Sequence, residues 1–348
     1  PTPVAAAAMR RVVCVTGVTG FAAAFVVESL LERGYIVHGT TRASDSPIAK
    51  QAHLFALPGA ADRLKVFEAD IMNLESLMPA FRGCEGVFHM ATPIEIPLQG
   101  EEPVAEAEAE VSQIKPALTG LRNVFDACAE LGIKRICLTS SNAAISFPPP
   151  ESGVINEECW SDEAWLHGQR RWYTMAKTRQ ERLAWELAEA AGVTLCTVCP
   201  PYIFGPRKTG HLNFSHAVLL EIINGAFATI PNDRHVQLVD ARDVAAVHVL
   251  GYERDEGRRY FACAAQVHMR ELCATAASHF PQFSESIPTN LADEGAGVSA
   301  HPAMDNARCV NLLGRAFRGW EETIIATIRS LVDSGDAVAH AAERVKRG

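Results

Sequence analysis

Short apolar runs alternate with longer stretches of helical spacing along the N-terminal part of the chain. The runs are nearly continuous, as expected of parallel strands that are buried on both faces. Gly34, Gly132 and Gly192 each end a helical stretch just before the next run, a usual place for a glycine cap. This order predicts an α/β fold with a doubly wound parallel sheet of the Rossmann type. The runs are Arg11–Val15, Tyr35–Thr40, Leu64–Glu68, Gly86–Met90, Arg135–Thr139 and Val193–Val198.

The alternation of apolar runs and helical stretches stops after Pro200, where loops rich in proline and glycine begin. A helix is expected near Leu212–Asn224 and a strand near His235–Val239. A helix from about Asp243 and a strand near Arg259–Cys263 then resume the earlier order. We therefore expect a smaller, discontinuous C-terminal substrate domain beside the domain that holds the parallel sheet.

The expected boundaries follow from these changes. The sheet domain would comprise residues 9–199 and about 241–263, and the substrate domain about 200–240 and 264–335. Residues 1–8, rich in alanine and proline, are predicted to be a disordered leader or an expression remnant, and residues 336–348 a tail.

The overall composition excludes several classes of protein. Hydrophobic residues make up 48% of the 348 residues and charged residues 21%, and no apolar run approaches the roughly 18 residues of a membrane span. The formal net charge of −9 offers no basic field to attract a phosphate backbone. We therefore predict a soluble protein that acts on a small molecule, with neither a membrane nor a nucleic acid as partner.

The cysteines and histidines point to no metal or disulfide. The ten cysteines are scattered through apolar segments, and the N-terminus lacks a secretory signal, so a cytoplasmic location is predicted. Cys196 and Cys199 have the spacing of redox and metal motifs, but a strand would direct their thiols to opposite faces. The twelve histidines show no metal-ligand spacing.

A glycine turn follows the first predicted strand. Gly17 and Gly20 permit a tight turn and let backbone N–H groups approach a pyrophosphate at the start of the next helix. Ala23 occupies the position where that helix packs closely on the strand. A glycine pair alone is more often an ordinary turn, but its place between a first strand and a helix predicts dinucleotide binding, with Phe21 beside the ligand.

The end of the second predicted strand indicates which dinucleotide binds. An NAD site offers a carboxylate to the adenosine ribose at this point, whereas here Thr41 is followed by Arg42. A guanidinium group can hold a 2′-phosphate through two hydrogen bonds, so Arg42 favours NADP over an ordinary surface role. Lys50 is a second candidate cation.

Further candidates stand at the carboxyl ends of later strands, where open α/β sheets bind ligands. Asp70 and Ile71 follow the third strand, and Ala91 and Thr92 follow the fourth. We assign all four to the cofactor, although Asp70 is alternatively only a helix cap.

Three polar side chains are candidates for proton transfer. Tyr173 and Lys177 are four residues apart, so a helix places both on one face, and an ammonium group beside a phenol lowers the phenol's pKa. The pair alone is as easily an ordinary amphipathic surface. Ser140 and Ser141 end the fifth strand at the same edge of the sheet, and either can supply a hydroxyl.

The glycine turn, the serines and the Tyr173/Lys177 pair together resemble the extended short-chain dehydrogenase/reductase superfamily. The resemblance covers nearly the whole chain, and the greatest likeness is to the group of dihydroflavonol 4-reductases and cinnamoyl-CoA reductases. It is carried by residues Val87–Pro93, Thr139–Ser141, Glu158–Asp162, Trp172–Lys177, Cys199–Pro206, Arg242–Ala245 and Phe317–Glu322.

The resemblance implies a role for each matching residue. Ser141, the second serine, is expected to be catalytic, Tyr173 to be the general acid, and Lys177 to lower the pKa of Tyr173 and bind the nicotinamide ribose. Pro200 and Ile203 would border the nicotinamide. The expected reaction is the reversible, NADPH-dependent reduction of an aldehyde or ketone, and neither a flavonoid nor a CoA thioester is specifically implied.

Two other functions are compatible with the same residues. A sugar-nucleotide epimerase or dehydratase shares the triad, but Ile145–Phe147 replaces the Val-Tyr-Gly sequence that such enzymes usually carry. A regulator that senses NADP without catalysis typically loses the Tyr/Lys pair, which this chain retains. The sequence leaves open whether the protein is a monomer or a homodimer.

Several residues receive a structural interpretation. His89 is expected to be a core residue with satisfied hydrogen bonds, and the acidic run Glu101–Glu110 to be one solvated helix face. Four residues are possible substrate contacts, although such residues are as often packing residues: Phe147, Tyr202, His211 and Phe214.

Overall fold

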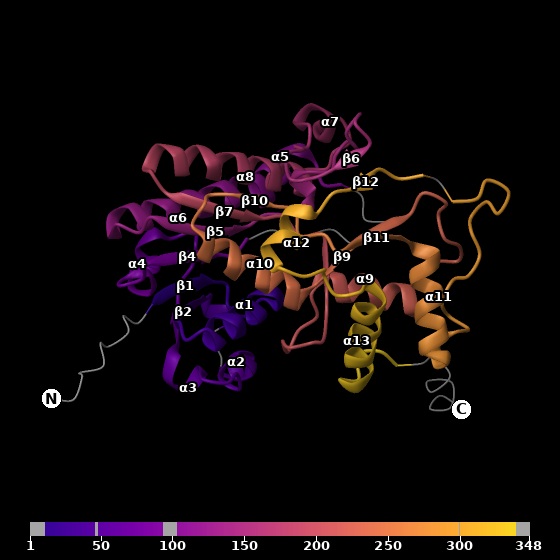
Figure 1. Cartoon of the computed structure of the whole chain (residues 1–348), viewed down its shortest axis with the longest axis horizontal. Helices are drawn as coiled ribbons and strands as arrows, with labels where there is room; N and C mark the ends of the chain where they lie inside the picture. The colour runs from indigo at the N-terminus through magenta and orange to yellow at the C-terminus, as the bar shows by residue number, and fades with distance from the viewer. Residues whose placement is uncertain (1–10, 46–47, 93–102, 299, 339–348) are drawn as a thin grey trace.

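The computed structural model describes residues 11–45, 48–92, 103–298 and 300–338. Its main feature is a parallel sheet that, within these residues, has seven strands in the order β10-β7-β5-β4-β1-β2-β3 (Figure 1). The prediction of a doubly wound parallel sheet is confirmed. The strands are β1 (Val12–Thr16), β2 (Ile36–Thr41), β3 (Leu64–Glu68), β4 (Gly86–His89), β5 (Arg135–Thr139), β7 (Thr194–Val198) and β10 (Arg259–Tyr260).

Strand order reverses at the middle of this sheet. From β1 the chain adds β2 and β3 on one side, and then returns to place β4, β5 and β7 on the other. In open parallel sheets, ligands bind at the carboxyl ends of the strands at this reversal. This topology predicts a ligand crevice at the ends of β1 and β4, where the glycine turn and Thr92 lie.

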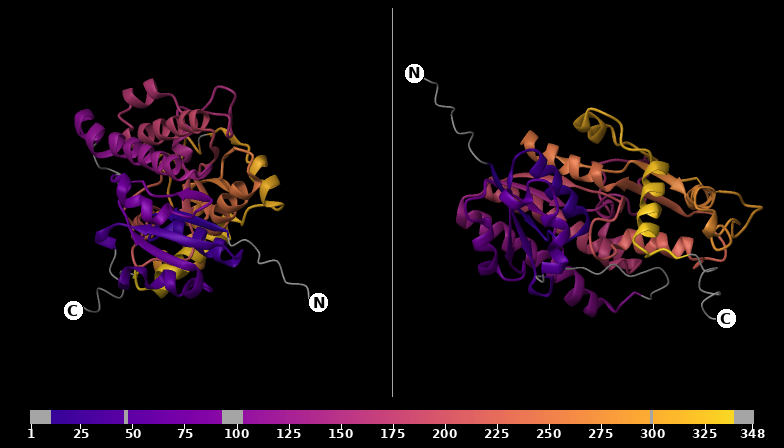
Figure 2. Two further views of the ribbon diagram at one scale, coloured as in Figure 1. Left: turned by 90° about the vertical axis from the view of Figure 1, so that its left-hand side faces the viewer. Right: turned by 90° about the horizontal axis from the view of Figure 1, so that it is seen from below.

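Helices cover both faces of the sheet, as Figure 2 shows. On one face α1 (Phe21–Glu32) packs against α10 (Ala241–Arg254). On the other, α6 (Lys115–Leu131) lies between α4 (Leu74–Phe81) and α8 (Trp172–Ala191). Because strands such as β4 are buried along their full length, they could not alternate between apolar and polar residues.

A second, smaller group of elements lies beyond the sheet. Its three-stranded sheet pairs β8 (Tyr202–Phe204) parallel and β11 (Ala265–His268) antiparallel to β9 (His235–Asp240). This sheet packs with α9 (Phe214–Ile223), α11 (Met269–His279) and α13 (Trp320–Asp333) around an apolar core of its own. Figure 1 shows α11 toward the opposite end of the molecule from α4, with α13 packed against it.

The remaining short elements join or flank these two groups. Two of them, β6 (Val154–Ile155) and β12 (Ala303–Met304), pair in a two-stranded sheet. The other short elements are α2 (Ile48–Phe55), α3 (Ala60–Arg63), α5 (Glu106–Ala109), α7 (Glu163–Gly168) and α12 (Ala307–Leu313).

Some expectations about individual segments were wrong in detail. The acidic run is not one helix face, since α5 ends at Ala109 and a π-helical turn, Glu110–Ile114, leads into α6; residues 101 and 102 lie outside the described residues. The strand expected near Arg259–Cys263 ends at Tyr260. The predicted leader, residues 1–8, also lies outside the described residues.

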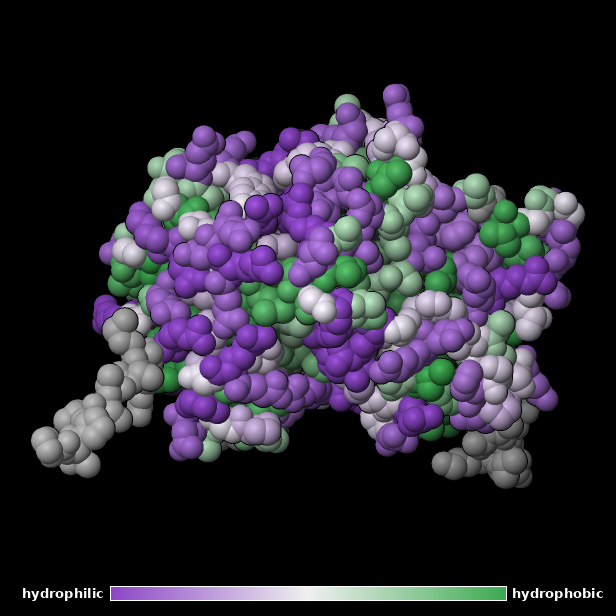
Figure 3. Space-filling view, viewed as in Figure 1, coloured by the Kyte–Doolittle hydropathy of each residue, from purple (hydrophilic) through white to green (hydrophobic). Residues whose placement is uncertain are grey.

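None of the helices that the structure describes is both long and apolar enough to cross a bilayer. On the face seen in Figure 3, small hydrophobic areas lie among mostly hydrophilic side chains.

Candidate active site

The turn after β1 requires glycine at its first position. Gly17 has a positive φ of 68°, which L side chains rarely adopt, and a Cβ there would lie 3.1 Å from the Cβ of Ala91. Gly20 is the N-cap of α1, and its N–H donates to the Gly17 carbonyl at 2.9 Å. The turn thus leaves the N-terminus of α1 open to an anion.

Phe21, expected beside the ligand, is buried where α1 meets the second group of elements. Its ring packs edge-on against Phe25 at 5.4 Å and His216 at 4.7 Å between ring centroids. The side chain of Phe21 therefore packs in the core, and only its backbone, at the start of α1, borders the turn.

Thr16 links the ends of β1 and β4. Its hydroxyl oxygen accepts the N–H groups of Met90 and Ala91, each at 3.0 Å, and lies 3.0 Å from Nδ1 of His89. Because the oxygen already accepts twice, its hydrogen points to Nδ1, which leaves the imidazole hydrogen on Nε2. Nε2 is buried without a partner among the described residues, so the expectation of a fully satisfied His89 was wrong.

An open pocket lies at the ends of β2 and β3. Thr41 and Glu68 are register partners there, and the Thr41 hydroxyl is buried without a partner within the described part of the chain. Arg42 lines this pocket, and Lys50 lies in α2, its side chain outside what the structure describes. The lining residues are Arg42, Ala43, Ser44, Glu68, Ala69, Asp70 and Ser76.

Asp70 and Ile71 have different surroundings. Asp70 is exposed at the pocket, where its carboxylate accepts the N–H of Met72 at 2.9 Å, whereas the N-cap of α4 is Asn73. Ile71 is buried, and its carbonyl accepts a hydrogen bond from Asn123 of α6 at 2.8 Å.

The two serines at the end of β5 have different partners. Ser140 is buried and donates to the carboxylate of Glu181 at 2.7 Å. Ser141 accepts the N–H of Ala143 at 3.2 Å and donates to the side chain of Asn142 at 3.3 Å. Glu181 thus holds Ser140 in the structure, and Ser141 is the hydroxyl that faces the candidate proton donor.

Tyr173 lies in the first turn of α8, beside Ser141. Burial raises the pKa of its phenol, and the nearby Tyr202 raises this pKa further. A hydrogen bond with Ser141 lowers it in part. The phenol is therefore protonated at neutral pH. A protonated phenol next to a serine hydroxyl can bond to one carbonyl oxygen together with that serine.

Lys177 lies one turn later on α8, and its side chain is buried. Its ammonium group donates to Thr92 at 2.9 Å, to the carbonyl of Thr139 at 3.3 Å and to Gln180 at 3.2 Å. Burial lowers its pKa to about 8, and Glu181 and Cys199 oppose this change. The structure thus brings Lys177 and Thr92 together, although they are 85 positions apart.

Pro200 and Ile203 follow β7 at the same edge of the sheet. The carbonyl of Pro200 accepts the N–H of Asn142 at 3.0 Å, directly beside Ser141. The N–H of Ile203, in β8, donates to Ser215 at 3.1 Å, and its side chain packs on the main core.

Aromatic rings flank this centre. Tyr202 stacks on Phe214, with 5.9 Å between ring centroids, and Phe147 stacks on Trp165 at 6.3 Å. His211, the fourth predicted contact, is exposed.

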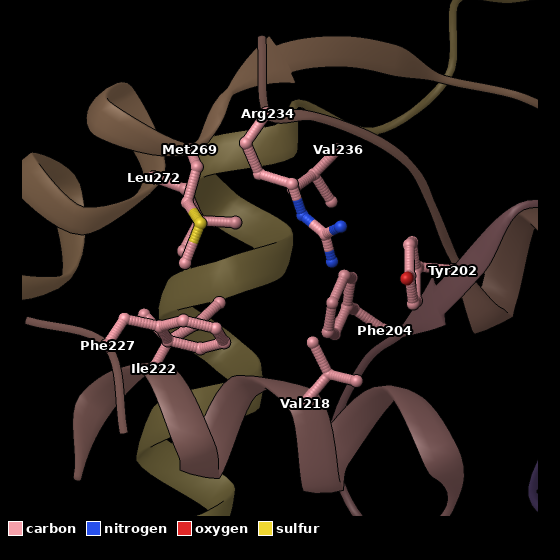
Figure 4. A pocket seen from close by; sticks show the side chains of 9 residues that line it. All are labelled: Tyr202, Phe204, Val218, Ile222, Phe227, Arg234, Val236, Met269 and Leu272. Carbon is pink, nitrogen blue, oxygen red and sulfur yellow. The ribbon is translucent and has the colours of Figure 1, made fainter. Parts of the chain in front are cut away.

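Beyond Tyr202 lies a small apolar pocket, into which Arg234 extends toward Tyr202 and Phe204 (Figure 4). Sequence reasoning missed Arg234 and the hydrogen bond of Asn142 to Gln237 at 2.8 Å, because neither belongs to a motif. No group of three or more His, Cys, Asp or Glu side chains in the described part of the chain could hold a metal ion.

The fold and this edge of the sheet define a dinucleotide-dependent enzyme of the extended short-chain dehydrogenase/reductase type. Residues 13–263 match the family model described as the NAD dependent epimerase/dehydratase family. The chain belongs to this family. The predicted resemblance to the dihydroflavonol reductase and cinnamoyl-CoA reductase group is also confirmed by its relatives.

Three similar proteins give the extent of the match. Cinnamoyl-CoA reductase 1 of Petunia hybrida is 34% identical over 329 residues, 93% of each chain. The crystal structure of vestitone reductase from alfalfa, Medicago sativa, has a TM-score of 0.76 and 28% identity, covering 93% of this chain and 99% of that one. Gre2 from Candida albicans, solved in complex with NADPH, has a TM-score of 0.76 and 25% identity, covering 93% and 99%.

Proposed function

We propose that this protein reduces the carbonyl group of a small aldehyde or ketone, with Tyr173 as the general acid. The cofactor is NADP(H), and the chain is an NADP-dependent oxidoreductase, in line with the reductases to which it is similar. The observation that carries the proposed mechanism is the pairing of the Tyr173 phenol with Ser141 at the end of β5.

The residues of the crevice fit a dinucleotide. The tight turn that Gly17 permits and the N-terminus of α1 suit a pyrophosphate. Arg42 would hold the 2′-phosphate, and the unpartnered hydroxyl of Thr41 lies at the same strand end. Asp70 and Ile71 would border the adenosine, and Ala91 would border the pyrophosphate.

The nicotinamide end would lie between β4 and β8. Thr92 and Lys177 would hold its ribose, while Pro200 and Ile203 would border the ring. Bound NADPH supplies the hydride that is added to the carbonyl carbon. We assign the proton to Tyr173, whose raised pKa keeps the phenol protonated until a carbonyl oxygen arrives.

Each residue of the triad would have a distinct task. Ser141 donates a hydrogen bond to the carbonyl oxygen, which gains negative charge as the carbon is reduced. Tyr173 gives its phenolic hydrogen to that oxygen and becomes a phenolate. Lys177, one helical turn away, stabilises the phenolate by its positive charge. In the reverse direction the phenolate would accept the proton of an alcohol.

The test is NADPH oxidation with a panel of aldehydes, ketones and a CoA thioester, aromatic and aliphatic. Tyr173→Phe removes only the hydroxyl, and Tyr202→Phe is the matched control beside it. We expect turnover with at least one carbonyl compound and its loss in Tyr173→Phe alone. A lack of turnover, together with nucleotide that stays bound through purification, would favour an epimerase or dehydratase instead.

A further inference from the structure

A buried ion pair lies directly behind the triad. Glu181 follows Lys177 by one turn of α8 and is fully buried, and its two carboxylate oxygens accept from Arg259 of β10 at 2.8 and 2.9 Å. The same carboxylate accepts the hydroxyls of Ser140 and Thr197, each at 2.7 Å. One carboxylate thus joins four elements: α8, β10, β7 and the end of β5.

Arg259 extends these contacts to the segment that follows Ser141. Its guanidinium donates to the carbonyl of Ala144 at 3.2 Å and to that of Glu157 at 3.0 Å, and also to the carbonyl of Cys159. The group lies 3.7 Å from the ring centroid of Trp160. The ion pair therefore holds both the strand end before Ser141 and the turn after it.

Stability alone is a weak reason to bury such a pair. Desolvation of two charges often outweighs their attraction, and packed apolar residues of similar volume are frequently as stable or more so. The position of this pair suggests another reason, since it touches the neighbour of Ser141 and the helix that carries Tyr173 and Lys177.

We propose that Glu181 and Arg259 are positioning residues for the triad, and that their opposite charges set the electrostatic balance at Lys177. Through Ser140 the pair fixes the backbone that presents Ser141. Through α8 the Glu181 carboxylate supports the buried ammonium of Lys177, while Arg259 limits that support. This inference rests on the proposed roles of Ser141, Tyr173 and Lys177.

Charged and titratable groups face Lys177 from several elements. His89 of β4 is buried, and desolvation together with the charge of Lys177 lowers its pKa to about 3, so it is neutral. Cys199, after β7, has its pKa raised by burial and by Glu181, so it is an uncharged thiol. Burial raises the pKa of Glu181, but the bonds from Arg259, Ser140 and Thr197 hold it below its ordinary value. Among these described groups, Glu181 and Arg259 are the two that carry charge.

The test compares the pH dependence of kcat in two variants. Glu181→Gln removes a negative charge, which lowers the pKa values of both Lys177 and Tyr173. The alkaline loss of activity should then begin at lower pH. Arg259→Met removes the positive charge behind Glu181 and should move this loss to higher pH. For buried charges about one helical turn apart, we expect the two variants to differ by about one pH unit or more.

Two further variants separate positioning from folding. The double variant Glu181→Gln/Arg259→Met removes both charges. Its kcat should therefore decline at nearly the same alkaline pH as that of the wild type, even if the variant is less stable. Ser140→Ala leaves the ion pair in place and should lower kcat several-fold without changing the KM for NADPH. Ser140→Ala also keeps the proposal testable if the charge variants do not fold.

Asp243→Asn is the matched control. Asp243, on α10, is a fully buried carboxylate that pairs with Arg315 at 2.7 Å and Arg318 at 2.5 Å. The substitution should reduce stability and leave the alkaline part of the pH profile of kcat unchanged.

The outcomes distinguish this inference from the proposed function. Opposite shifts in Glu181→Gln and Arg259→Met support it, and shifts in one direction, or no shift in either, would overturn it. If neither charge variant folds, an unchanged kcat in Ser140→Ala would overturn it as well. Full activity of Tyr173→Phe in the same assay would overturn the proposed function itself.

Discussion

The cofactor crevice and the substrate side of the active site are built in different ways. The crevice is set by backbone features at strand ends, such as the positive φ of Gly17 and the carboxyl ends of β1 and β4. The substrate side is set by side chains that meet from distant segments, such as Tyr202 with Phe214 and Asn142 with Gln237. The first arrangement uses short motifs, and the second depends on tertiary packing.

Under the proposed assignments, the chemistry and the choice of substrate depend on different parts of the molecule. Lys177, on α8, and Thr92, after β4, lie beside the parallel sheet. Arg234 and Phe227 lie in the second group of elements, around a separate core. We therefore propose that variation in the second group would change the substrate while the hydride-transfer site stays intact.

After the loss of Tyr173, the largest expected effect on kcat comes from the serines at the end of β5. It tests whether Ser140 and Ser141 have different roles. Ser141→Ala should lower kcat by about 100- to 1,000-fold, the usual effect of removing one donor to a developing oxyanion. Ser140→Ala should have a much smaller effect, since Ser140 bonds to Glu181. Steady-state kinetics of both variants checks this. Equal losses would contradict the distinction between the two serines, and a larger loss in Ser140→Ala would mean that the wrong serine was assigned.

The next effect tests whether burial of the charged Lys177 side chain destabilises the folded protein. Burial lowers the pKa of Lys177 from 10.5 to about 8, so the unfolded chain binds more protons than the folded one between these values. The contribution of Lys177 to the free energy of unfolding should therefore rise with pH in this window, by on the order of 3 kcal/mol at most.

Lys177→Met isolates this contribution. Below pH 8 the wild type carries the full penalty of a buried charge, and the variant carries none. Urea unfolding at a series of pH values should show that the stability of the variant minus that of the wild type falls between pH 8 and 10.5. Parallel curves would show that Lys177 keeps its ordinary pKa in the folded protein.

A smaller effect tests the backbone character of the cofactor crevice. Gly17→Ala should weaken NADPH binding by about tenfold or more, because its Cβ would lie 3.1 Å from that of Ala91. Gly34→Ala is the matched control, since Gly34 also has a positive φ, 82°, but no atom within 4 Å of the added Cβ. Fluorescence titration with NADPH measures both. Equal binding by the two variants would contradict the assignment of the turn.

The smallest effect concerns cofactor choice. Arg42→Ala should raise the KM for NADPH about tenfold while changing that for NADH little, because only NADPH carries the 2′-phosphate. Arg33→Ala, a surface arginine that pairs with Glu253 at 2.8 Å, serves as the control. If the KM values for NADPH and NADH rise equally, Arg42 does not bind the 2′-phosphate.

The sequence predicted the parts that follow from local chemistry. The strand Arg135–Thr139 was placed without error, because its centre, Ile136–Leu138, is a buried apolar run with a polar residue at each end. Gly17 was recognisable because its turn has a fixed spacing. The residues alone left open which serine acts, and the resemblance implied Ser141. In the structure Ser140 bonds to Glu181, 41 positions away, a contact that no local pattern contains.

Other features depend on contacts between distant residues, which no local pattern contains. The unpartnered Nε2 of His89 follows from the way Thr16 bonds to the backbone after β4. Arg259 looked like one residue of a strand and is in fact the buried partner of Glu181, 78 positions away. Arg234 precedes β9 in a loop, and only packing brings it to Tyr202.

The central claim is that Tyr173 donates the proton, and single-turnover reduction of a carbonyl substrate by NADPH tests it most directly. Removal of a general acid typically costs about 100- to 10,000-fold in rate, so Tyr173→Phe should lose at least about 100-fold in the hydride-transfer step. Its affinity for NADPH should be nearly unchanged, and Tyr202→Phe should remain within a few-fold of the wild type. A Tyr173→Phe protein that reduces the substrate at the wild-type rate would contradict the account.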